Sequence, residues 1–116
     1  MKQISDYLKK FATDRGLECI QDELYNVIII KEATEGYEDA EPYILQGHMD
    51  MVAVKTPECD IDMTKDPLQL YVEDERIHAK GTSLGGDDGI AIAYVLALLD
   101  ADDISHPRVE VILTVD

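Results

Sequence analysis

The chain has 116 residues, of which 46% are hydrophobic and 30% are charged, a composition typical of one folded domain. Its 25 acidic and 10 basic residues give a formal net charge of −15 at pH 7. This charge repels nucleic-acid phosphates and anionic membrane surfaces, so it excludes a nucleic-acid or membrane partner. The length predicts a single soluble domain over residues 1–116.

Cysteine usage and hydropathy indicate a cytoplasmic protein. Cys19 and Cys59 lie outside any CxxC spacing, and no secretory signal is recognisable at the start of the sequence. The most apolar run, Ile90–Leu99, is much shorter than the roughly twenty residues that cross a bilayer. We therefore expect a core helix there and a cytoplasmic location.

The first predicted element is an amphipathic helix over Lys2–Arg15, which Gly16 can end in a left-handed cap. Strands are predicted next over Leu17–Gln21 and Tyr25–Lys31. The second of these contains the unbroken apolar run Val27–Ile30, a pattern that favours a strand covered on both faces.

The second half of the chain continues the alternation. A short strand is predicted over Tyr43–Gln46, a hairpin over Leu68–Val72 and Arg76–Ala79, and a strand over Val109–Val115. The segment Asp88–Asp100 is predicted to be a helix buried against a sheet, because it is apolar nearly all round. This order of elements predicts an α/β fold, a sandwich built around a mixed sheet.

The most informative motif is GHMDMV at Gly47–Val52, which directly follows a predicted strand. The nitrogen of His48 and a carboxylate oxygen are ligands of the kind that hydrolytic zinc sites use, and Asp50 is placed to bond the second ring nitrogen. A hydrogen-bonded loop histidine is the alternative interpretation of the same residues.

A second motif, GGDDG at Gly85–Gly89, opens the apolar helix. Asp87 or Asp88 could cap that helix. One cap needs one residue, however, and two adjacent carboxylates repel each other unless a cation lies between them. A phosphate loop is excluded, because Asp87 stands where that motif has its lysine.

The predicted topology can bring distant acidic groups to one edge. His48 and Asp116 each follow the carboxyl end of a strand, and Asp87 lies at the start of a helix. Ligands of α/β sheets usually bind at this edge. We therefore expect the three groups on one rim, with His48 and Asp87 facing a common point suited to a divalent cation.

Three further features are interpreted as structural. Asp60–Asp66 alternates like a calcium loop, but Lys65 and Tyr71 replace the glycine and glutamate that such a loop requires. His78 lies in a predicted strand and His106 precedes a proline, so both are expected to be structural and not ligands.

With these residues identified, the chain resembles the aminoacyl-histidine (Xaa-His) dipeptidases, a branch of the di-zinc aminoacylase and carboxypeptidase family. The motifs that carry the resemblance are LQGHMDMV (Leu45–Val52), KDPLQL (Lys65–Leu70), AKGTSLGGDDGIAIA (Ala79–Ala93) and HPRVEVILTVD (His106–Asp116). They extend over nearly all of the chain. The resemblance implies part of the catalytic domain of a zinc-dependent exopeptidase.

The resemblance also implies roles for individual residues. His48 matches the histidine that binds one zinc, and Asp50 matches the catalytic-site aspartate that orients it. Asp87 matches the aspartate that bridges two zinc ions, and the peptide bond after it is expected to be cis. Asp88 matches a position with no ligand role.

For the complete enzymes, the resemblance implies hydrolysis of Xaa-His dipeptides, including β-alanyl-histidine, by metal-activated water. Their TVD motif is followed by two glutamates, later zinc ligands and a lid domain. The 116 residues are therefore expected to be a fragment with a partial zinc site and no activity alone. The alternatives are a non-catalytic α/β binding or assembly module, with Asp87 as a helix cap, and a homo-oligomer paired through an exposed sheet edge.

Overall fold

The computed structural model describes all residues from Met1 to Asp116. The chain divides into two compact units. The first consists of Met1–Asp50 and Asp87–Asp116, and the second of Met51–Gly86. Each unit is described separately below, and the single domain expected over residues 1–116 stays a prediction.

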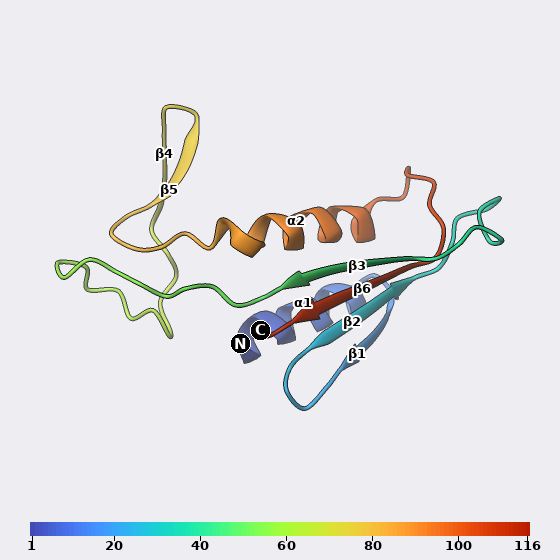
Figure 1. The fold of residues 1–116 in the computed structure, drawn as a ribbon, viewed down its shortest axis with the longest axis horizontal. Coiled ribbons are helices and arrows are strands. Elements are labelled where there is room, and N and C mark those ends of the chain that lie inside the picture. The colour runs from blue at the N-terminus through green and yellow to red at the C-terminus, as the bar shows by residue number, and fades with distance from the viewer. The chain divides into compact units, whose positions relative to one another are not determined.

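The first unit is built on a four-stranded sheet with two helices (Figure 1). Its elements are α1 (Lys2–Asp14), β1 (Glu18–Gln21), β2 (Val27–Lys31), β3 (Tyr43–His48), α2 (Gly86–Asp100) and β6 (Val109–Thr114). The strand order is β1-β2-β6-β3, in which β3 and β6 are parallel and the other pairs are antiparallel. The α/β prediction with a mixed sheet is confirmed.

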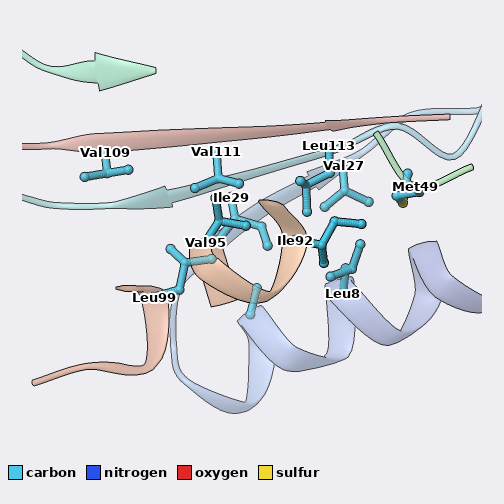
Figure 2. Packing of buried hydrophobic residues seen from close by; sticks show 11 residues of the cluster. Leu8, Val27, Ile29, Met49, Ile92, Val95, Leu99, Val109, Val111 and Leu113 are labelled. Carbon is cyan, nitrogen blue, oxygen red and sulfur yellow. The ribbon is translucent and has the colours of Figure 1, made fainter. Parts of the chain in front are cut away.

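Both helices pack on the same face of this sheet (Figure 2). The core contains Leu8 and Ala12 of α1, Ile92, Val95 and Leu99 of α2, Val27 and Ile29 of β2, Val109, Val111 and Leu113 of β6, and Met49. The sheet residues alternate along each strand, as the two-residue period of a strand requires. Ile28 and Ile30 lie on the opposite face and are only half-buried, so the prediction that this run is covered on both faces was wrong for these residues.

Helix α2 is also covered on one side only. Its buried residues, Ile92, Val95 and Leu99, follow the spacing of one helical face. Ile90 and Tyr94 are exposed. The expectation of a helix buried against the sheet therefore holds for this one face. Neither helix has the length and apolar character needed to cross a membrane.

Two side chains from other elements fix the C-terminal end of α2. The ammonium group of Lys31 donates to the carbonyl oxygens of Leu98 and Ala101, at 3.0 and 2.5 Å. The Arg15 side chain donates to the carboxylate of Asp100 at 2.8 Å. The lysine satisfies carbonyls that have no partner within the helix, and its charge complements the negative end of the helix dipole.

The second unit contains an antiparallel hairpin of β4 (Leu70–Glu73) and β5 (Arg76–Ala79). The turn Asp74–Glu75 has φ values of 50° and 60°, the left-handed pair that a tight hairpin turn requires. The rings of Tyr71 and His78 are stacked across the strands with centroids 5.0 Å apart. His78 thus contributes to strand pairing, in agreement with its structural interpretation.

Asp62, Thr64, Asp66 and His106 have hydrogen-bond partners. The carboxylate of Asp62 accepts the N–H and the hydroxyl of Thr64, and the carboxylate of Asp66 accepts the Asp62 N–H. These hydrogen bonds close a local turn over residues 62–66, of the kind that aspartates favour in loops. His106 is buried, and its backbone N–H donates to the hydroxyl of Thr34.

The core predicts a clear difference between two leucine substitutions. Leu8→Ala should lower the free energy of unfolding by about 3 kcal/mol, because it opens a cavity at a site with no solvent exposure. Leu24→Ala, at a side chain that is 65% exposed, should change it by less than about 0.5 kcal/mol. Urea denaturation of both variants measures the difference, and equal losses would contradict this core.

Candidate metal centre

The end of β3 is held by its parallel neighbour and by the start of α2. His48 lies opposite Thr114 of β6, and the following N–H, of Met49, donates to the Thr114 carbonyl at 2.7 Å. A Cβ atom on Gly47 would lie 3.0 Å from Oδ2 of Asp88 and 3.4 Å from Cβ of Ala91. A side chain at this position would therefore require the Asp88 carboxylate to shift by a few tenths of an ångström, so glycine suits this close approach.

The start of α2 is irregular at its two aspartates. Asp87 and Asp88 have non-helical backbone angles, with φ/ψ of −96°/107° and −112°/28°. The peptide bond between them is cis, as the resemblance implies. The Asp87 side chain is 93% exposed, and its carboxylate is hydrogen-bonded to the ring of His48. It is not hydrogen-bonded to a backbone N–H of the helix.

The imidazole of His48 lies between two carboxylates. Nδ1 is 3.0 Å from Oδ1 of Asp50 and 3.1 Å from the Asp50 carbonyl oxygen, and Nε2 is 3.1 Å from Oδ1 of Asp87. A neutral imidazole has one N–H donor and one lone pair. With Nδ1–H donated to Asp50, the Nε2 lone pair faces a carboxylate oxygen, so a proton or a metal ion at Nε2 stabilises the arrangement.

The same contacts change the proton affinity of the ring. Desolvation lowers the pKa of His48, but the Asp87 hydrogen bond and the charge and hydrogen bonds of Asp50 outweigh it and raise the pKa above the ordinary 6.5. The His48 side chain is one-third exposed, so solvent screens these interactions in part. The local electrostatics thus favour a positive charge at this position.

The separation of His48 and Asp87 fits a shared zinc ion. Two ligand atoms of one tetrahedral zinc lie about 3.4 Å apart, and the observed Nε2–Oδ1 distance is 3.1 Å. The bond from Nδ1 to Asp50 leaves Nε2 as the ligand nitrogen. However, the chain contains no group of three or more histidine, cysteine, aspartate or glutamate side chains that could hold a metal ion. His48 and Asp87 therefore suit zinc in type and separation, but they supply only two of the ligands that a zinc ion needs.

Asp116 and Asp88 lie outside the pair formed by the side chains of His48 and Asp87. Asp116 does not join His48 and Asp87 in a three-residue group, because β6 ends at Thr114, level with His48, and Asp116 lies beyond it. Asp88, to which the sequence assigned no ligand role, contacts the backbone: its Oδ2 accepts the His48 N–H at 3.2 Å. The sequence signal for this contact was Gly47, which marks a close approach of two backbones.

No family model matches this chain. Among curated proteins, it is 40% identical over 113 residues to the cytosol non-specific dipeptidase of Escherichia coli (strain K12), which covers 97% of this chain and 23% of that protein. The chain therefore spans about a quarter of the length of this relative.

Solved structures give the same result. The aminoacylhistidine dipeptidase from Vibrio alginolyticus matches with a TM-score of 0.93 and 42% identity, over 98% of this chain and 23% of that one. The aminopeptidase PepT from Bacillus cereus ATCC 10987 matches with a TM-score of 0.67 and 27% identity, over 97% and 30% of the two chains. The resemblance to the aminoacyl-histidine dipeptidases is confirmed, as a match of nearly the whole chain to about a quarter of such a protein.

The contacts of His48 predict how its titration changes. In zinc-free protein with a chelator, Asp87→Asn should lower the pKa of His48, because it removes a charged acceptor at Nε2. A raised folded-state pKa stabilises the fold below the unfolded-state pKa, and this contribution is lost as the pH rises through the raised value. NMR titration of the imidazole measures the shift, with the exposed Asp103→Asn as a charge-matched control. An unchanged His48 pKa in Asp87→Asn would contradict the contact.

Proposed function

We propose that this chain supplies part of the catalytic site of a zinc-dependent dipeptidase that hydrolyses Xaa-His dipeptides. The observation that carries the proposal is His48, whose two ring nitrogens face the carboxylates of Asp50 and Asp87. The names of two relatives, a cytosol non-specific dipeptidase and an aminoacylhistidine dipeptidase, support the substrate class. The first of these names also supports a cytoplasmic location.

Each residue of the site has a separate task in this proposal. His48 Nε2 and Asp87 Oδ1 would hold one zinc ion, and the exposed carboxylate of Asp87 would offer its other oxygen to a second ion. Asp50 keeps the proton on Nδ1 and fixes the ring orientation. Bound zinc would polarise the scissile carbonyl and lower the pKa of a bound water.

The 116 residues alone should bind zinc weakly and show no peptidase activity. Catalytic zinc sites use about three protein ligands and one water, whereas only His48 and Asp87 are placed as ligands here. The remaining coordination positions would be filled by water. The rival interpretation, a binding module in which Asp87 caps α2, lacks the hydrogen bond from a helix N–H to this carboxylate that a cap requires.

Isothermal titration calorimetry tests the metal site directly. The unaltered chain should bind zinc, and His48→Ala and Asp87→Asn should each lower the affinity at least about tenfold, because each removes one of two ligands. His78→Gln is the matched control, since this histidine belongs to the second unit and is stacked on Tyr71. It should leave the affinity unchanged.

Two outcomes of the titration would count against the proposed site. Negligible binding by the unaltered chain would remove it. Equal binding by the unaltered chain and His48→Ala would assign the zinc to other carboxylates of this acidic surface.

A chimaeric enzyme tests the catalytic role. The matching quarter of the E. coli cytosol non-specific dipeptidase is replaced by this chain, and hydrolysis of β-alanyl-histidine is followed with zinc present. The folded chimaera should be active, and His48→Ala in it should lower kcat/KM at least about a hundredfold, because the metal ligand is lost. This chain alone should show no turnover. A folded chimaera with zinc bound and no activity, or equal activity of the His48→Ala form, would refute the role.

A further inference from the structure

The backbone of β3 has a free edge beside the proposed metal ligands. Strand β3 is the outermost strand of the sheet, next to β6 only. The N–H groups of Tyr43 and Met49, at its two ends, donate to carbonyls of the β6 side at 3.0 and 2.7 Å. Because N–H directions alternate along a strand, the N–H of His48 points away from β6, so no carbonyl of β6 can accept it.

Asp88 supplies the missing acceptor. Its Oδ2 accepts the His48 N–H at 3.2 Å and occupies the space into which a side chain at Gly47 would project. Asp88 follows Asp87 in the chain, and Asp87 contacts the ring of the same histidine. Two consecutive residues of α2 thus contact one residue of β3, one through its backbone and one through its side chain.

We propose that Asp88 is a positioning residue, which holds the backbone of His48 so that Nε2 stays within ligand distance of Asp87. The inference rests on the proposed function, since it assigns the held pair to zinc. Asp88 itself does not touch the metal. Its carboxylate oxygen is engaged by the backbone N–H, whereas the exposed carboxylate of Asp87 is the one that faces the imidazole.

The hydrogen bond, more than the charge, performs this task. An asparagine at position 88 would keep an oxygen acceptor of the same reach, whereas an alanine would leave the His48 N–H without a protein partner. The negative charge of Asp88 adds to those of Asp50 and Asp87 near one imidazole. Asp88→Asn removes this charge and keeps the oxygen acceptor, so it should change the position of the His48 backbone little.

Two measurements test the positioning role. In zinc-free protein, hydrogen exchange by NMR should show the His48 amide at least about tenfold faster in Asp88→Ala and within about threefold of the unaltered chain in Asp88→Asn. The Met49 amide, bonded to Thr114, should stay equally protected in both. Calorimetry with zinc alone should show affinity lowered about tenfold by Asp88→Ala and retained by Asp88→Asn. Asp103→Ala is the control for a lost exposed charge.

Each outcome decides one step of the inference. Unchanged exchange of His48 in Asp88→Ala would overturn the holding contact, whatever the zinc result. Faster exchange with unchanged zinc affinity would overturn the role in metal binding while leaving the zinc site itself intact. If the unaltered chain binds no zinc, the proposed function fails and the role toward zinc fails with it, and exchange still decides the contact. A urea midpoint lowered equally in Asp88→Ala and Asp88→Asn, with no rescue of His48 protection, would show a merely structural role.

Discussion

The close approach of the end of β3 to the start of α2 is the constraint on which the site depends. Gly47 allows it, because a side chain there would meet Oδ2 of Asp88 at 3.0 Å. The approach places His48 beside Asp87 although 38 residues separate them in the sequence. The parallel pairing with β6 places His48 level with Thr114. The core contacts of α2 hold the start of that helix, and with it Asp87, beside the end of β3.

This geometry concentrates negative charge around a single imidazole. The carboxylates of Asp50 and Asp87 each lie within about 3 Å of a ring nitrogen, and Asp88 reaches the backbone of the same residue. Three carboxylates gathered on one histidine repel one another unless a positive charge is present. A proton on the ring supplies one positive charge, whereas a divalent ion supplies two and adds direct bonds to both ligand atoms. Either cation would relieve the repulsion, and the raised pKa of His48 shows that the ring favours a positive charge.

The sequence predicted the helices and strands well. The features that it did not predict depend on which side of an element packs against the rest of the fold. The apolar periods and runs, together with the turn residues between them, located every helix and strand to within a few residues. The same periods could not show that Ile28 and Ile30 face away from both helices, since a continuous apolar run has no polar face to mark its direction. The contact of Asp88 with the His48 backbone was also missed, because Gly47 indicates a close approach at this point but does not identify the side chain that makes it.

The candidate site lies within one structural unit, so its geometry depends on the packing of only a few elements. The three carboxylates hydrogen-bonded to His48, those of Asp50, Asp87 and Asp88, belong to the first unit, although the 36 residues of Met51–Gly86 interrupt that unit in the sequence. Loop closure over such a segment costs little more than over a shorter one, because the cost rises only with the logarithm of length. The geometry of His48 and Asp87 is therefore governed by the packing of β3, β6 and α2. Within that packing, Leu113 of β6 and Ile92 of α2 belong to the same core cluster as Met49, the residue after His48 (Figure 2). Because one core cluster packs against both the strand end and the helix, the positions of His48 and Asp87 depend on the same packing.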